Sequence, residues 1–262
     1  MGLNKSFVYN STIEKIAQEA RQAKDNETLA NVCVNLNISD EIFLGKVDLW
    51  LAKNALSAVY RTLKKYPALR ERMNYFGTLN GFKNVKDDLF FRVNPNCSFF
   101  VSNMVKNATD NIAIQCRTAF ENNGLAVAFI TGSPPYIFSG IIINGKSLHQ
   151  QTIINNLEFG ERSGHSPQGC KSVKSVVEHE IGHILDFMLG ISNSREYKKF
   201  ISQYDILQIG SNLSKYSVMG NVISDREVVA EAYTEYCNNP APRSIAKNIG
   251  QMIEQKYRKI YG

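Results

Sequence analysis

Apolar residues recur every three or four positions along most of the chain, a spacing that predicts amphipathic helices. The strongest stripe occupies residues 46–65, where Leu56, Val59 and Leu63 share one face and Pro67 ends the helix. A thinner and more polar stripe predicts a helix over residues 11–36. Further helices are predicted at residues 103–122, 173–189, 225–236 and 245–261.

The centre of the chain changes from a helical to an extended pattern. Residues 125–130 and 136–143 are rich in β-branched and aromatic side chains, and a Gly-Ser-Pro-Pro turn separates them. Asn144-Gly145 predicts a second hairpin turn before a strand at residues 153–159. Residues 75–96 break into short pieces without a clear period. We therefore expect an α+β protein that is mostly helical and has a small antiparallel or mixed sheet.

Length and charge narrow the class of protein. A chain of 262 residues with 44% hydrophobic and 21% charged residues can bury a full core as one large domain, or as a main domain with a smaller appendage. Thirty Lys and Arg against 24 Asp and Glu give a net charge of +6. The basic residues occur in pairs or short groups instead of the long stripe that tracks phosphates. Nucleic-acid binding is therefore not expected as the main function.

The cysteines and the lack of long apolar segments indicate where in the cell the protein is expected. The five cysteines are odd in number, far apart and in no CxxC pair, so neither a disulfide framework nor a cysteine zinc site is encoded. The N-terminus has no apolar core typical of a signal peptide, and no apolar run is long enough to span a bilayer. We expect a cytoplasmic protein with no membrane partner, or one that is virion-associated or exported by a non-classical route.

The predicted helix at residues 173–189 contains the chemistry-bearing motif His179-Glu180-Ile181-Gly182-His183. Histidines four residues apart share one helical face, so both imidazoles can bind one zinc ion, and Glu180 beside them can act as a general base on a metal-bound water. The alternative is a pair of ordinary histidines beside an acid. With only four histidines in the chain, this spacing on an amphipathic helix favours metal binding.

A catalytic zinc needs a third protein ligand and an open position for water. Glu227 and Glu231 are four residues apart on a helix rich in Val and Ala, where buried acids need a cation or a donor. Glu227 is the preferred third ligand. The alternative is a capping box in which Ser224 and Glu227 bond to the helix backbone and Glu231 is solvated.

Three other residues could complete or support the site. Asp186 lies three residues beyond His183, but a straight helix carries it away from an ion between the histidines, so we expect it to support the site or form a salt bridge. His149 and His165 precede the motif in loop or strand context. They stay as less favoured alternatives for the third ligand.

The segments HEIGHILD (residues 179–186) and EVVAEAY (residues 227–233) together resemble the zincin metallopeptidases related to the anthrax lethal factor catalytic domain and the Pro-Pro endopeptidases. They are most similar to peptidase domains of phage head-associated and mobile-element proteins. The resemblance implies zinc ligands, a base and an acid behind a ligand histidine. These are His179, His183 and Glu227 as ligands, Glu180 as the base and Glu231 as the supporting acid.

The same resemblance implies a tyrosine before the glutamate helix that stabilises the oxyanion, and Tyr216 occupies the matching stretch. It extends over about residues 46–261. The domain division it implies is a helical extension at residues 1–45 and a zincin-like domain at residues 46–262, whose small sheet packs on the active-site helix.

The function expected from these residues is that of a zinc-dependent endopeptidase acting on a protein or peptide substrate. The strand at residues 136–143 is expected to line the cleft and pair with an extended substrate, through Tyr136, Ile141, Ile142 and Ile143. One alternative is a phage or virion structural or interaction protein that keeps a zincin fold, as part of a phage or mobile-element assembly. Another is a metal-dependent hydrolase of non-peptide amides.

Overall fold

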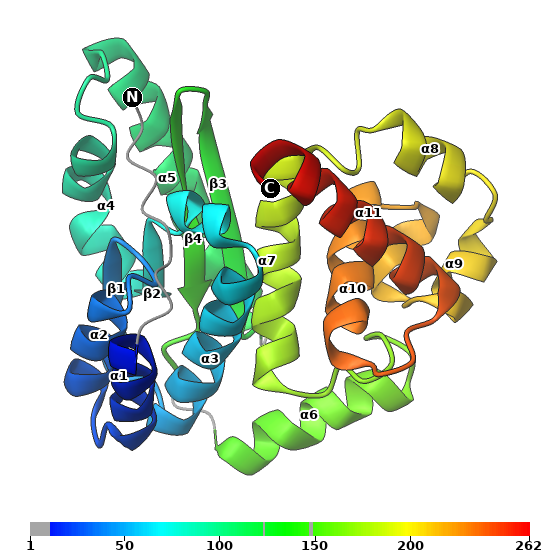
Figure 1. Cartoon of the computed structure of the whole chain (residues 1–262), viewed down its shortest axis with the longest axis horizontal. Helices are drawn as coiled ribbons and strands as arrows, with labels where there is room; N and C mark the ends of the chain where they lie inside the picture. Colours follow the sequence, from blue (N-terminus) through cyan, green and yellow to red (C-terminus); the bar gives the residue numbers. More distant parts are fainter. Residues whose placement is uncertain (1–10, 123, 147–148) are drawn as a thin grey trace. The chain divides into compact units, whose positions relative to one another are not determined.

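The computed structural model describes residues 11–122, 124–146 and 149–262, and Figure 1 shows their secondary structure. The helices are α1 (Ser11–Gln22), α2 (Asn26–Asn35), α3 (Leu49–Lys65), α4 (Leu79–Val93), α5 (Phe99–Glu121), α6 (Gln150–Arg162), α7 (Val173–Leu189), α8 (Arg195–Ile201), α9 (Ile206–Asn212), α10 (Asp225–Asn238) and α11 (Ser244–Tyr261). The short 3-10 helices are η1 (Pro67–Arg72) and η2 (Tyr216–Asn221), and the strands are β1 (Glu41–Phe43), β2 (Tyr75–Thr78), β3 (Ala126–Ser133) and β4 (Tyr136–Ile143). The described chain is thus mostly helical with a small sheet, as the α+β expectation requires.

The chain divides into two compact units, residues 1–147 and residues 148–262. The predicted boundary after residue 45 does not coincide with this division. Strand β1 at Glu41–Phe43 pairs with β2, and Leu29 and Cys33 of α2 are buried, so the described residues before 46 belong to the first unit. Residues 1–10 of the predicted extension lie outside the described residues.

The sheet of the first unit is mixed and has the strand order β1-β2-β4-β3. β1 pairs with β2 and β2 with β4 in parallel, whereas β3 and β4 form the predicted antiparallel hairpin around the turn at Pro134-Pro135. Residues Gly140–Ile143 of β4 therefore have a strand on each side. The expected pairing of a substrate with this part of the strand is wrong, because both backbone edges are already hydrogen-bonded.

Aromatic residues fill the core of the first unit. Phe82 of α4 contacts Tyr75, Phe129 and Phe138 of the sheet, with ring centroids 4.8–6.2 Å apart. Helix α4 was not predicted, because residues 75–96 show no clear apolar period. The N-terminus of α4 is nevertheless set by a local interaction. Thr78 Oγ1 accepts a hydrogen bond from the Gly81 amide at 3.2 Å, as an N-cap residue does.

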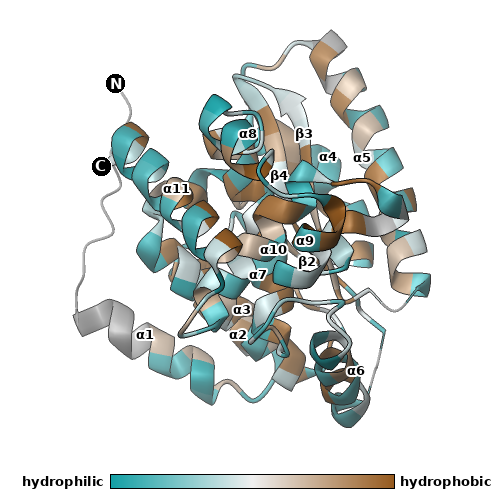
Figure 2. Ribbon diagram, turned by 90° about the vertical axis from the view of Figure 1, so that its right-hand side faces the viewer, coloured by the Kyte–Doolittle hydropathy of each residue, from teal (hydrophilic) through white to brown (hydrophobic). Residues whose placement is uncertain are grey.

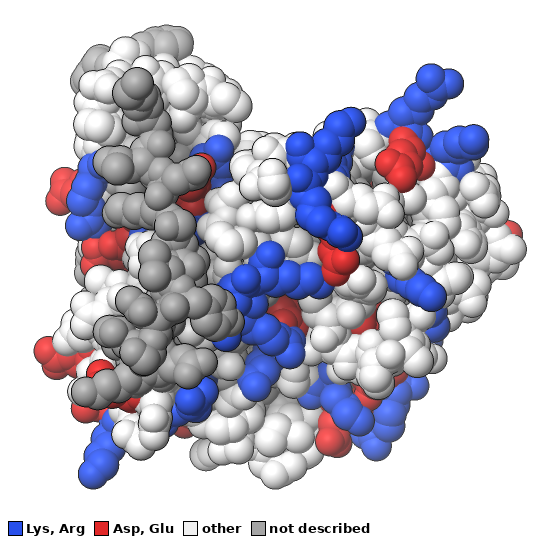
Figure 3. Space-filling model, viewed as in Figure 1, with Lys and Arg blue, Asp and Glu red and all other residues white. Residues whose placement is uncertain are grey.

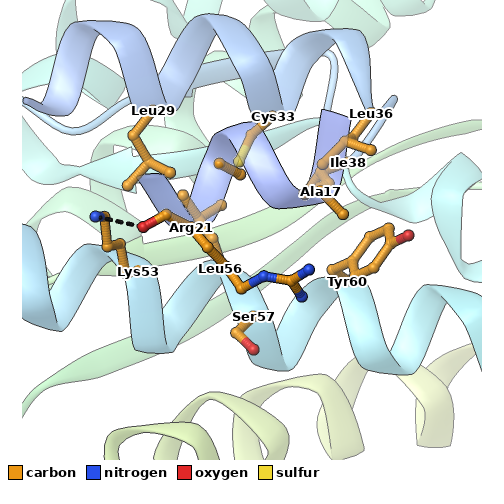
Figure 4. A pocket seen from close by; sticks show the side chains of 11 residues that line it. Ala17, Arg21, Leu29, Cys33, Leu36, Ile38, Lys53, Leu56, Ser57 and Tyr60 are labelled. Carbon is orange, nitrogen blue, oxygen red and sulfur yellow. Dashed lines mark hydrogen bonds between the residues drawn. The ribbon is translucent and has the colours of Figure 1, made fainter. Parts of the chain in front are cut away.

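A cavity of about 160 Å³ lies among α1, α2 and α3 of the first unit, and Figure 4 shows its lining. Its walls are mainly apolar and include Leu29, Cys33 and Leu56. Lys53 Nζ donates a hydrogen bond to the Arg21 carbonyl at 2.9 Å and so ties α3 to α1. The predicted single helix over residues 11–36 is two helices, since Asp25 caps a new helix through the Thr28 amide.

The second unit is helical, and its first helix replaces a predicted strand. Residues 153–159 lie in α6, where Ile153 is buried and Phe159 is 66% exposed. Ile153, Ile154 and Leu157 fit a helical face as well as a strand, and no hairpin forms at Asn144-Gly145 because the chain continues from β4 towards α6.

Helices α7, α10 and α11 form the centre of the second unit, where α10 packs against both α7 and α11. In Figure 2, α11 carries both hydrophobic and hydrophilic residues along its length, and its buried side includes Ile245, Ile249 and Ile253. Gly250 permits the close contact with α10, because a Cβ there would lie 2.2 Å from the Tyr236 ring. The two helices that carry the predicted site residues are thus neighbours.

Basic side chains on the face shown in Figure 3 occur in separate groups with acidic side chains among them. None of the described helices has the length and apolar character needed to cross a membrane.

Candidate metal centre

Helix α7 begins and ends at the predicted residues, Val173 and Leu189, because both ends are set locally. Ser172 and Ser175 form a reciprocal capping box, and Gly190 follows the helix with a φ of +59°. His179 and His183 consequently lie one turn apart on the same face, with their Nε2 atoms 3.1 Å apart.

Helix α10 brings Glu227 to the two histidines. Its Oε2 lies 3.2 Å from His179 Nε2 and 3.5 Å from His183 Nε2. Ligand atoms about 2.0–2.1 Å from a tetrahedral zinc ion are about 3.3 Å apart, so the three observed separations fit the edges of that tetrahedron. The same three residues form the possible metal cluster found among the described residues.

The chemistry of the donor set also fits a cation. Glu227 Oε2 is buried, yet it has no hydrogen-bond partner although two imidazole nitrogens face it. A buried carboxylate oxygen without a donor is costly, and a shared cation removes that cost. The capping-box alternative does not hold for Ser224, whose side chain makes no capping bond to α10.

Glu231 lies behind His179. Its Oε1 is 2.6 Å from His179 Nδ1, and the Glu231 side chain is 7% exposed. A carboxylate at Nδ1 favours the tautomer that carries the proton there, which leaves the Nε2 lone pair free for a metal. The predicted supporting acid thus lies beside a predicted ligand histidine.

The imidazoles and the carboxylates of the site shift each other's pKa in opposite directions. Burial alone would lower the pKa of His179, but the carboxylates of Glu227 and Glu231 raise it well above the ordinary value. Burial alone would raise the pKa of Glu227, but His179 and His183 hold it well below its ordinary value. Glu227 is therefore ionised at neutral pH, as a metal ligand must be.

Gly182, inside the motif, allows α7 and α10 to approach closely. A Cβ at this position would lie 2.8 Å from Ala230 Cα, which is backbone that cannot rotate away. The glutamate on α10 reaches the histidines on α7 only because these helices pack this tightly.

We expect Gly182→Ala to destabilise the protein by about 1–3 kcal/mol, since the added methyl group must push the helices apart. Urea unfolding of the purified variant measures the change. Gly160→Ala is the matched control: it lies in α6, and a Cβ there would meet only the rotatable Ser166 hydroxyl at 3.1 Å. Equal stability of the Gly182→Ala variant and the wild type would contradict the close-packing explanation.

Two more predicted residues lie at the same site. The Tyr216 ring contacts the His179 ring, with centroids 5.7 Å apart, and burial together with nearby Glu227 raises the pKa of Tyr216 to about 12. Glu180 follows His179 on α7, is partly exposed, and lies near enough to raise the pKa of both His179 and Tyr216. The base and the tyrosine candidates therefore adjoin the metal donors.

Asp186 does not have the role expected of it. Its two carboxylate oxygens accept hydrogen bonds from the amide and the hydroxyl of Ser192, both at 2.7 Å, and the residue is 4% exposed. Asp186 therefore anchors the turn after α7 instead of supporting a ligand histidine or forming a salt bridge.

The predicted substrate residues belong to the first unit, so they are not among the residues that the second unit brings together. Ile141, Ile142 and Ile143 are at most 1% exposed, and their side chains form part of a core. Tyr136 is partly exposed and donates a hydrogen bond from its hydroxyl to the Asn96 carbonyl at 3.1 Å.

The two remaining histidines differ in their positions. His149 is exposed and immediately precedes α6. His165 contacts Tyr216, so it lies at the edge of the site although it is not a metal donor. Gly164 is the sequence signal that ends α6 and places His165 directly after it, whereas the contact with Tyr216 depends on backbone hydrogen bonds from Lys215 and Tyr216.

Comparison of the chain with protein-family models, curated proteins and solved structures found no match in any of the three. The fold and the donor cluster thus define an α+β protein with a candidate metal centre.

Proposed function

We propose that this protein is a zinc-dependent endopeptidase. One observation carries the proposal: the donor atoms of His179, His183 and Glu227 are spaced as ligands of one tetrahedral ion, and Glu180 adjoins them on the same helix. A purely structural zinc site needs no such base.

In this proposal, each residue has a role that its position supports. A zinc ion held by the three donors would make hydroxide available near neutral pH. Glu180 takes the proton of the attacking water and passes it to the departing amine. Glu231 fixes the orientation of His179 through Nδ1. The raised pKa of Tyr216 keeps its phenol protonated, so it can donate to a developing oxyanion.

The ligand assignment predicts an order of metal affinities. Purified protein should carry close to one zinc ion per chain, and Glu231→Ala should weaken zinc binding about 10- to 100-fold by freeing the His179 ring. Glu227→Ala should weaken it more, because it removes a donor atom. Metal analysis of the purified variants and competition with a chromophoric chelator measure both effects. A larger loss of zinc affinity in Glu231→Ala than in Glu227→Ala would identify Glu231 as the third ligand.

Digestion of a peptide library, read by mass spectrometry, tests the proposed activity. The zinc-loaded wild type should cleave internal peptide bonds, and a chelator should abolish cleavage. A protein that binds zinc but cleaves no peptide, while it hydrolyses small non-peptide amides, would replace the endopeptidase assignment with an amide hydrolase.

A further inference from the structure

The ring of His165, which is not a metal donor, lies against Tyr216. Their ring centroids are 5.4 Å apart and their planes meet at 72°, an edge-to-face geometry that aromatic rings favour. Tyr216 meets His179 in a similar way, at 5.7 Å and 70°. The tyrosine ring therefore contacts both a metal-donor histidine and a histidine outside the donor set.

The C-terminal end of helix α6 fixes the position of His165. Gly164 has a φ of +72° and donates its amide to the Glu161 carbonyl at 3.0 Å, while the His165 amide donates to the Gly160 carbonyl at 2.9 Å. These two bonds are those of a Schellman motif, in which a left-handed glycine ends the helix. The motif fixes the direction of the backbone after that glycine. The backbone of His165 is therefore held in place although the residue is exposed.

Backbone hydrogen bonds then join this helix end to residues 215–216, the tyrosine segment. The Lys215 amide donates to the Gly164 carbonyl at 2.8 Å, and the Tyr216 amide donates to the His165 carbonyl at 3.3 Å. Lys215 Nζ also donates to the Ser163 carbonyl at 2.6 Å. The two segments run side by side, which brings the rings of His165 and Tyr216 into contact.

We propose that His165 is a positioning residue that holds the Tyr216 ring against His179, and so fixes the phenol that donates to the developing oxyanion in the proposed reaction. The inference rests on the proposed peptidase function. Because the contact is made by ring edges and faces, another aromatic ring of similar size replaces the imidazole, whereas a methyl group does not.

Kinetic analysis of three variants tests the role. We expect His165→Ala to lower kcat about 10- to 100-fold with little change in KM, since a displaced catalytic group costs that much. His165→Phe should stay within about twofold of the wild type, because it keeps the ring contact. His149→Ala, which removes the other exposed histidine of this unit, is the matched control and should have wild-type kinetics.

Coupling to Tyr216 is the second requirement. In a Tyr216→Phe background, His165→Ala should cause little further loss, because the group that it positions is already gone. Full additivity of the two losses would overturn the proposal. So would a His165→Phe variant as slow as His165→Ala, which would mean that the imidazole itself acts in the reaction.

An NMR measurement on metal-free protein separates this inference from the proposed activity. The Tyr216 ring resonances, assigned by their loss in Tyr216→Phe, should shift in His165→Ala and much less in His165→Phe. Unchanged resonances in His165→Ala would overturn the positioning role even in an active enzyme. If the wild type cleaves no peptide, the proposed function fails, while the resonances still show whether His165 positions the ring.

Discussion

Glu180→Gln should bind zinc as the wild type does and lose peptide hydrolysis by about 10²- to 10⁴-fold, the usual contribution of a general base. Glutamine keeps the size of the side chain but cannot accept the proton of the attacking water. The donor atoms of His179, His183 and Glu227 do not involve Glu180, so the metal content should not change. The loss should appear in kcat with little change in KM.

Glu158→Gln is the control for this substitution, because Glu158 is an exposed glutamate of α6 in the same unit. Both variants are compared by initial rates on one cleaved peptide from the library, and by zinc content. Cleavage by Glu180→Gln at the wild-type rate would remove the base assignment. Loss of zinc from the Glu180→Gln variant would show instead that Glu180 is one of the metal ligands.

The bounds of α7, which carries the candidate metal donors, could be predicted to the residue because the signals at both helix ends are local. Ser172 and Gly190 mark the two ends of α7, and the histidine spacing fixes which residues share a face. The partner glutamate was predictable for a different reason: an acid on an apolar helix needs a partner. The distances within the cluster and the packing of Gly182 on Ala230 come only from the folded chain.

Elements that depend on distant parts of the chain could not be predicted in this way. Strand β1 has three residues and forms because β2, more than 30 positions later, supplies its partner. The apolar residues of α6 fit a strand or a helix equally well over so short a stretch. The contact between His165 and Tyr216 is long-range as well, because it depends on backbone hydrogen bonds from Lys215 and Tyr216 to the end of α6.

The tyrosine segment depends on a buried ion pair that the sequence did not reveal. Glu235 on α10 is 0% exposed, and its carboxylate accepts hydrogen bonds from Arg243 Nε at 3.0 Å and Nη2 at 2.6 Å. The guanidinium also donates to the carbonyls of Ser211, at 3.0 Å from Nη1, and Leu213. Arg243 thus joins α10 to the chain that leads into Tyr216.

We expect Arg243→Ala and Glu235→Ala each to lower the free energy of unfolding by about 3–5 kcal/mol, because the first leaves the buried Glu235 carboxylate without its guanidinium and the second leaves the guanidinium without its carboxylate. The double variant should lose less than the sum of the two, since it leaves no unpaired charge. Arg258→Ala is the matched control: its pair with Glu254 is 3.7 Å long with an exposed guanidinium, so its removal should cost less than about 1 kcal/mol. Urea unfolding of all four variants measures these values, and a loss in Arg243→Ala no larger than in Arg258→Ala would show that the buried pair does not hold the segment.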